Sequence, residues 1–300
     1  MKLLIEIVIF ASLVLVATAK DESALESWLQ DIVPFIGNGT ISEQMPFMVS
    51  IRRSSQELIS QQFGNGHVCG GVILSRSHIL TAASCLETRI TRVPHFDIIV
   101  IAGTRYRYDS TGTERREPRN VSIHPGYTDD PLHNNLAIIE LNSTLPEDWP
   151  EISPITLNNA TVAAGLNCQI FGWGLPLSMH GPRELLSGNI NIVNNNVCRG
   201  NMENRFCAGP DFISGCAGDD GGPVVCNGIL YGLIDFTDIH YCNNSVPGRH
   251  TAYINIADYY DWIMEHLPPT PVGDGNNGVT QMVFSSAMLI SAAAIVKMFK

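Results

Sequence analysis

The chain has 300 residues, 45% of them hydrophobic and 16% charged, enough for one large domain or two modest ones. With 26 Gly and 17 Pro the composition is neither collagenous nor low-complexity, and the apolar fraction argues against disorder. Its 18 Lys and Arg against 29 Asp and Glu give a net charge of −11. A surface that acidic, with no basic stripe, repels a phosphate backbone, which argues against nucleic-acid binding.

The first residues have the pattern of a secretory signal peptide. Met1-Lys2 precedes an apolar run over 3–16, and Ala17-Thr18-Ala19 supplies a small-residue cleavage site. A membrane anchor is the alternative, but the run is shorter than the ~20 residues that span a bilayer. We therefore predict a signal peptide over residues 1–19, followed by an acidic segment over residues 20–34.

Eight cysteines follow the leader, without a CxxC pair and without a Cys/His cluster at zinc-finger spacing. In an oxidising compartment they are expected to form disulfides rather than to bind metal. The nine histidines are scattered at no ligand spacing. The sequence therefore predicts neither a metal site nor a cofactor.

Short β-rich runs recur between clusters of Gly, Pro, Asn and Asp, a rhythm typical of an all-β barrel or sandwich. The spacing of Ala24, Leu25, Trp28 and Leu29 fits a short amphipathic helix in the acidic segment. From residue 47 onward, helical periodicity is confined to residues 256–267, where Ile256, Tyr259, Tyr260 and Ile263 share one face. The predicted strands cover 47–51, 68–74, 98–101, 136–141, 168–173, 189–193, 223–225, 229–236 and 251–256.

After the predicted helix comes a linker over residues 269–282 and an apolar tail over residues 283–300. Small residues over 273–278, a polar spacer and the apolar run match the order of a glycosylphosphatidylinositol (GPI) attachment signal. The alternatives are a secreted protein with an apolar extension, which we favour, and a single-pass membrane anchor, which we place third.

Behind a signal peptide, N-x-Ser/Thr triplets are candidate glycosylation sites. They begin at Asn38, Asn120, Asn142, Asn159 and Asn243.

Several ordered segments resemble the trypsin-like serine protease family. Cys69–Leu74 and Leu80–Cys85 resemble its CGGxLI and LTAAHC segments, Asn135–Leu141 its DIALLxL, and Cys216–Pro223 its CxGDSGGP. The resemblance covers residues 35–268 and implies two six-stranded antiparallel β-barrels with a C-terminal helix. It also implies four disulfides that use all eight cysteines: Cys69–Cys85, Cys168–Cys226, Cys198–Cys207 and Cys216–Cys242.

The three residues at the family's catalytic positions differ from its triad. Ser84 stands where the family has His, Asn135 where it has Asp, and Asp220 where it has Ser. A serine hydroxyl has no pKa near neutrality and cannot act as the general base, and an amide carries no charge to stabilise an imidazolium. A carboxylate on Asp220 adds negative charge where the oxyanion would form. The residues predict an inactive homologue, with no catalytic residues.

Two further regions depart from the family. By the resemblance, Ser214 stands at the floor of the specificity pocket. Asp235-Phe236-Thr237 replaces the family's Ser-Trp-Gly segment, so the side chain of Thr237 occupies the place where the family's glycine keeps the pocket open. The activation junction corresponds to Phe35–Gly39, and no Lys or Arg occurs in 21–51, so a trypsin-like enzyme could not cut there.

The expected function is that of a non-catalytic extracellular homologue that binds an extracellular protein partner. By the resemblance it would be a cofactor, decoy or regulator in an immune or reproductive secretion. One alternative is a hydrolase with a rearranged site using Asp220, paired with Asp219, although neighbours in sequence rarely point at one another. The other is a membrane-anchored adhesion or receptor protein.

Overall fold

The structure is a computed structural model that describes residue 36 and residues 39–87, 93–174, 181–198, 200–209, 213–235 and 250–269. The predicted signal peptide, the acidic segment, the apolar tail and nearly all of the linker lie outside these residues. The chain divides into a compact unit, residues 1–267, and a second unit, residues 268–300. No helix among the described residues is long and apolar enough to span a membrane.

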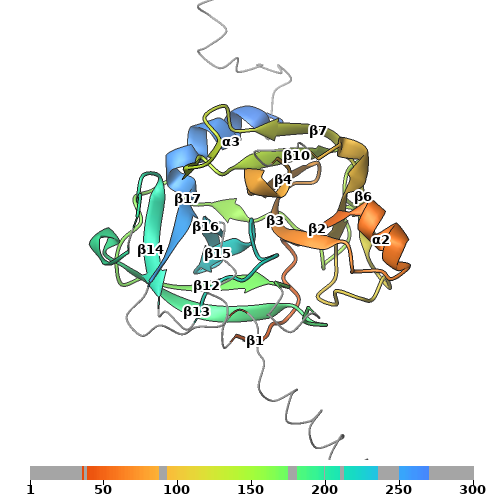
Figure 1. The fold of residues 1–300 in the computed structure, drawn as a ribbon, viewed down its shortest axis with the longest axis horizontal. Coiled ribbons are helices and arrows are strands. Elements are labelled where there is room, and N and C mark those ends of the chain that lie inside the picture. Colours follow the sequence, from red (N-terminus) through yellow and green to blue (C-terminus); the bar gives the residue numbers. More distant parts are fainter. Residues whose placement is uncertain are drawn as a thin grey trace, which may run out of the picture. The chain divides into compact units, whose positions relative to one another are not determined.

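Seven strands of the N-terminal half form one curled antiparallel sheet in the order β6-β5-β2-β3-β4-β10-β7 (Figure 1). A separate two-stranded ribbon, β8-β9, precedes β10. The bounds are β2 Met48–Arg53, β3 His67–Ser75, β4 His78–Thr81, β5 Ile98–Ala102, β6 Glu114–Arg116, β7 Pro118–Ile123, β8 Thr128–Asp129, β9 Leu132–His133 and β10 Ala137–Leu141.

Six strands of the C-terminal half close into a barrel in the order β13-β12-β15-β16-β17-β14, because β14 pairs with β13 again. The short strands β1 and β11 add to this sheet along β13 and β16. The bounds are β1 Thr40–Ile41, β11 Thr156–Leu157, β12 Asn167–Gly172, β13 Leu186–Val193, β14 Arg205–Gly209, β15 Pro223–Cys226, β16 Ile229–Ile234 and β17 Thr251–Asn255.

Successive side chains of a strand point to opposite faces, and the buried apolar residues accordingly form three separate cores. In β10, Ile139 packs inside the N-terminal sheet, whereas its neighbour Ile138 faces the core between the two sheets. That middle core also holds Leu230 of β16 and Ile263 of the C-terminal helix, so residues from both halves bury one another. Because successive side chains of a strand point to opposite faces, a strand buried on both sides is apolar throughout.

The expected all-β fold with a C-terminal helix is confirmed. The helix is the 3-10 turn η4, Ile256–Tyr259, continued by α3, Tyr260–His266. The N-terminal sheet has seven strands and is curled, where the resemblance implied six in a closed barrel. Three further 3-10 turns lie at η1 Ala83–Cys85, η2 His95–Asp97 and η3 Asn195–Val197.

One helix was not predicted. Helix α2, Ser54–Ser60, buries none of its side chains, so it has no apolar face that periodicity could detect. It is held by polar contacts instead: the backbone N–H of Ser55 donates to Asp97 over 2.7 Å, and Glu57 forms a 2.8 Å ion pair with Arg52. Periodicity alone therefore underestimated the helix content.

Candidate active-site region

Ser84 and Asn135 lie in direct contact, as their family positions imply. Ser84 belongs to the 3-10 turn η1 after β4, and Asn135 precedes β10, which pairs with β4. The backbone N–H of Ser84 donates to Asn135 Oδ1 over 2.8 Å, and Asn135 Nδ2 donates to Ser84 Oγ over 3.1 Å. The exposed fraction of Asn135 is 1%, so these bonds are shielded from water.

Asp220 lies in a tight buried turn that presses against the N-terminal sheet. The backbone N–H of Gly70 donates to the carbonyl of Asp220 over 2.9 Å. The following residue, Gly221, has φ +74°, and a Cβ there would meet the Thr81 hydroxyl and lie 2.7 Å from the nitrogen of Ala82. Only glycine accommodates this approach, which places Asp220 beside the turn that carries Ser84.

A residue outside the predicted site, Asp235, joins this region from the end of β16. It accepts a 2.9 Å hydrogen bond from Asn135 Nδ2 and a 2.6 Å charged hydrogen bond from Arg205 Nε of β14. Arg205 also donates to the carbonyl of Leu132 over 2.9 Å. Asp235 was noted in the sequence only as part of the segment that replaces Ser-Trp-Gly. Its contact with Asn135, 100 residues away, had no local signal.

The amide of Asn135 has little hydrogen-bonding capacity left for another partner. Both Nδ2 hydrogens are donated, one to Ser84 and one to Asp235, and Oδ1 accepts from the Ser84 backbone. Asparagine offers two donors and one carbonyl acceptor, so its donors are fully used. Among the described residues, the hydrogen bonds of Ser84 include none to a histidine. This set forms a polar bridge between the two halves of the fold.

Asp219, beside Asp220, is fully buried without an ion pair among the described residues. Its carboxylate accepts backbone hydrogen bonds from Gly174 over 2.6 Å and from Cys216 over 2.8 Å. Burial raises its pKa to about 6, although these two bonds and the charge of Arg107 oppose the shift. A Cβ on Gly174 would collide with this carboxylate, so the glycine leaves room for it.

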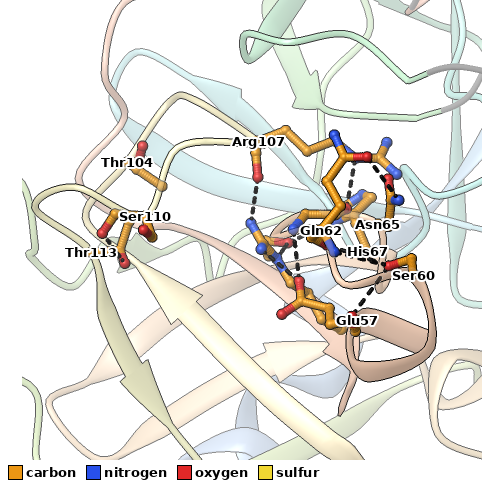
Figure 2. Close-up of polar contacts among 12 residues, drawn as sticks. Glu57, Ser60, Gln62, Asn65, His67, Thr104, Arg107, Ser110 and Thr113 are labelled. Carbon is orange, nitrogen blue, oxygen red and sulfur yellow. Dashed lines mark hydrogen bonds and ion pairs between the residues drawn. The ribbon is translucent and has the colours of Figure 1, made fainter. Parts of the chain in front are cut away.

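A chain of hydrogen bonds runs from helix α2 to Gly218. Figure 2 shows Glu57 of α2 and His67, two of its members, close together. Arg52 pairs with Glu57 and donates through Nε to Ser50 Oγ over 2.9 Å. Ser50 Oγ lies 2.7 Å from His67 Nδ1, and His67 Nε2 lies 3.0 Å from the carbonyl oxygen of Gly218. The chain connects the surface helix with the turn that carries Asp219 and Asp220.

The partners of His67 determine its protonation. The carbonyl of Gly218 can only accept, so His67 Nε2 carries the proton. The hydroxyl of Ser50 receives the hydrogen of Arg52 Nε and donates its own to His67 Nδ1. Burial and the nearby charges of Arg107 and Arg52 hold the pKa of His67 well below 6.5. His67 is therefore neutral and fixed in one tautomer.

The remaining predicted site residues are placed in part. Three disulfides are present as predicted: Cys69–Cys85, Cys168–Cys226 and Cys198–Cys207. The fourth involves Cys242, which lies outside the described residues. Ile36 of the expected activation junction is fully buried with φ +52°, and Ser214 is buried.

The candidate glycosylation sites fall into two groups. Asn142 and Asn159 lie in exposed loops, and Asn120 lies in β7 with its side chain also exposed. Asn38 and Asn243 lie outside the described residues, and their occupancy stays a prediction. The described residues contain no group of three or more metal-ligating side chains.

The fold combines a closed six-stranded barrel, a curled sheet and a C-terminal helix, and the segments at the catalytic positions meet between the sheets. This arrangement defines a trypsin-like protein. The family model for Trypsin matches residues 36–263. The chain is 30% identical to Trypsin-3 of Homo sapiens over 268 residues, which cover 83% of this chain and 80% of the relative. It is 32% identical to Trypsin of Xenopus laevis over 213 residues (67% of this chain, 81% of the relative). With Kallikrein-5 of Homo sapiens it shares 31% identity over 208 residues (66% and 67%). The chain belongs to the trypsin family.

Proposed function

We propose that this member of the trypsin family is a non-catalytic extracellular protein that acts by binding another protein. The observation that carries the proposal is the hydrogen bonding of Asn135. Its amide joins the Ser84 hydroxyl to the Asp235 carboxylate, in the place where a serine protease needs a carboxylate that orients a histidine. A hydroxyl at Ser84 cannot take a proton from a nucleophile at neutral pH.

The charge of the neighbouring turn adds support. Asp220 follows Gly218 and Asp219 in the segment that would donate backbone N–H groups to an oxyanion. A carboxylate about 4 Å from a developing oxyanion raises its energy by about 4 kcal/mol at an effective dielectric constant near 20. This repulsion opposes the tetrahedral intermediate of peptide hydrolysis.

The extracellular setting rests on the disulfides and on the predicted signal peptide. Three disulfides in a domain of this size are typical of secreted proteins. Because the scaffold is intact while the catalytic positions differ, we infer a role in protein recognition, as a cofactor, decoy or regulator in an immune or reproductive secretion.

Substrate turnover tests the proposal directly. The purified chain should hydrolyse no peptide, ester or amide substrate above the buffer rate, and serine-directed phosphonates should not label it. A trypsin assayed in parallel shows that the substrates and probes work. Saturable turnover that disappears in the Asp220→Ala variant would overturn the proposal in favour of a hydrolase with a rearranged site. Turnover that persists in that variant would point to a contaminating protease and leave the Asp220 site inactive, as proposed.

A further inference from the structure

A pocket of about 550 Å³ lies between the segment that joins α2 to β3, the segment that joins β5 to β6 and the segment before β13. Its volume falls within the range of ordinary ligand sites. The described lining does not include Ser84, Asn135 or Asp220, so the pocket is separate from the catalytic positions. Its polar and charged lining residues are Gln62, Asn65, Tyr106, Tyr108, Asp109 and Arg183.

Arg183 presents an unpaired guanidinium to this pocket. The residue is exposed, and within the described part of the chain its side chain makes neither a hydrogen bond nor an ion pair. Residues 175–180, which precede it and lie outside the described residues, include no Asp or Glu. The nearby Arg105, in contrast, forms an ion pair with Glu184 over 3.3 Å. Arg183 therefore keeps its N–H donors for a ligand.

The backbone of Arg183 is fixed although its side chain is exposed. The backbone N–H of Arg107 donates to the carbonyl of Arg183 over 2.8 Å, and Tyr106 forms an antiparallel β-bridge with Glu184. This short ladder joins the segment that carries the two tyrosines to the segment that carries Arg183. The pocket is therefore largely formed before a ligand arrives, which lowers the entropic cost of binding.

The uncharged groups of the pocket add mainly hydrogen-bond donors. Tyr106 Oη accepts a 2.8 Å hydrogen bond from Arg105 Nη2, so its own hydrogen can be donated to a ligand. The hydroxyl of Tyr108 has no hydrogen-bond partner among the residues that the structure describes. Gln62 Oε1 accepts from Asn65 Nδ2 over 3.1 Å, which leaves the NH₂ group of Gln62 as a donor and Asn65 Oδ1 as an acceptor.

One carboxylate, that of Asp109, also lines the pocket. Its Oδ1 accepts the backbone N–H of Thr111 over 2.8 Å, and this bond lowers the pKa of Asp109, so the group is charged at neutral pH. A second guanidinium offsets it, because the Cζ of the buried Arg107 lies 5.2 Å from the centre of the Tyr108 ring. Arg107 makes no ion pair within the described ranges; it donates to backbone carbonyls instead. Arg183 and Arg107 together outweigh Asp109, so the charge at the pocket is positive.

We propose that this pocket binds the carboxylate of an Asp or Glu side chain on a protein partner. The guanidinium of Arg183 forms paired hydrogen bonds with the carboxylate, and the hydroxyls of Tyr106 and Tyr108 donate to the same group. Tyr and Arg are the residue types that most often carry binding energy between proteins, which favours a protein segment over a free small acid. Asp109 repels a second acidic group, so the pocket selects one carboxylate.

The charge of the whole chain makes this attraction local. A net charge of −11 repels acidic partners at longer range, so binding of an acidic peptide must come from the groups of a particular site. The proposal goes beyond the proposed function, because it uses none of the catalytic positions and holds whether or not the chain hydrolyses peptides.

The test measures binding of a small acidic probe to the full chain. The probe is an amidated peptide of glycine and serine with one central glutamate and an uncharged fluorescent label, and fluorescence anisotropy reports its affinity. A matched peptide with glutamine in place of glutamate keeps the shape and removes the charge. We expect saturable binding of the glutamate peptide and none of the glutamine peptide. The unlabelled glutamate peptide should displace the probe at least about tenfold better than acetate, which offers a carboxylate without a peptide.

Single variants locate the site. Arg183→Gln, at an exposed position whose side chain has no partner to lose in the described structure, should weaken binding by about tenfold or more. Arg119→Gln removes the same charge at an exposed position outside the pocket and should change the affinity less than about twofold. Asp109→Asn keeps an acceptor for Thr111 and removes the repulsion, so it should strengthen binding by about two- to fivefold. Tyr108→Phe, which removes only a hydroxyl, should weaken it by about threefold.

Several outcomes would overturn the proposal. Unchanged binding in Arg183→Gln, or equal weakening in Arg183→Gln and Arg119→Gln, would place the peptide elsewhere. Weaker binding in Asp109→Asn, with binding of a lysine peptide, would mean that the pocket takes a cation. Equal displacement by acetate and by the peptide would make the ligand a free small acid. Hydrolysis of peptide substrates would overturn the proposed function but would leave the order of these affinities unchanged, so the two failures can be told apart.

Discussion

The amide of Asn135 donates a hydrogen bond to the carboxylate of Asp235 over 2.9 Å, and so joins the curled N-terminal sheet to the C-terminal barrel. Both residues are buried, and Asp235 is neutralised on its other side by Arg205 at 2.6 Å. Amide, carboxylate and guanidinium balance one another in charge and in donors and acceptors. A substitution at one of these positions should therefore change what the other two contribute to the free energy of unfolding.

Introducing a carboxylate at position 135 should destabilise the fold. In Asn135→Asp, two buried carboxylates would face each other across about 3 Å, and one guanidinium cannot neutralise both. We expect a loss of about 3 kcal/mol in the free energy of unfolding at pH 7, and a smaller loss near pH 4, where one carboxylate is protonated. Urea denaturation at both pH values measures the effect.

Exchanging the two groups provides the control. The double variant Asn135→Asp with Asp235→Asn restores one carboxylate and one amide, so it should recover at least half of the lost stability. A double variant no more stable than Asn135→Asp would show that the two side chains are not coupled.

Restoring catalysis should require more than the three triad positions. Asp220→Ser alone should remain inactive, because Ser84 supplies no base. The triple variant Ser84→His, Asn135→Asp and Asp220→Ser should have weak activity, because the new carboxylate at position 135 faces Asp235. A further variant adds Asp235→Ser to remove that carboxylate, and Pro34→Arg so that trypsin can cut the activation junction. After trypsin treatment, its kcat/KM for a peptide amide should exceed that of the triple variant by at least about tenfold. Robust activity of Asp220→Ser alone would reveal a hidden base.

Asp219 should make stability depend on pH between about 4 and 6. The pKa of Asp219 is about 6 in the folded chain, above its ordinary value of 3.8. The stabilisation that its protonated form gives to the fold is therefore fully present below pH 4 and is lost as the pH rises through 6. Relative to Asp219→Asn, the wild type should lose about 3 kcal/mol across that interval. Denaturation curves for both chains at pH 4, 5, 6 and 7 measure it. A difference that does not change with pH would mean that a cation pairs with Asp219 in solution.

Removing the Ser50 hydroxyl should break the buried chain that ends at Gly218. In Ser50→Ala, Arg52 Nε and His67 Nδ1 each lose a partner, and unmet buried polar groups cost about 1–3 kcal/mol each. We expect a loss of about 2 kcal/mol by thermal or urea unfolding. Ser110→Ala, at an exposed position, should change stability by less than about 0.5 kcal/mol. Equal effects of the two substitutions would contradict the geometry around His67.

Much of the fold could be predicted because it is encoded locally. A short, nearly continuous apolar run identifies a strand such as β10, whose neighbours Ile138 and Ile139 enter different cores. The cysteine pattern, read through the family resemblance, indicated the three disulfides that the structure contains. Helix α2 escaped prediction because its stability comes from Asp97, some forty residues away, rather than from a buried face.

The candidate site shows the same division. The sequence alone determined which residues occupy the catalytic positions, because Ser84, Asn135 and Asp220 stand inside recognisable motifs. Only the tertiary structure decided what they contact. The bridge from Asn135 to Asp235 and on to Arg205 brings together three segments from two sheets, and the pKa of Asp219 follows from its burial. Hydrogen bonds and desolvation act through space, so no pattern along the chain announces them.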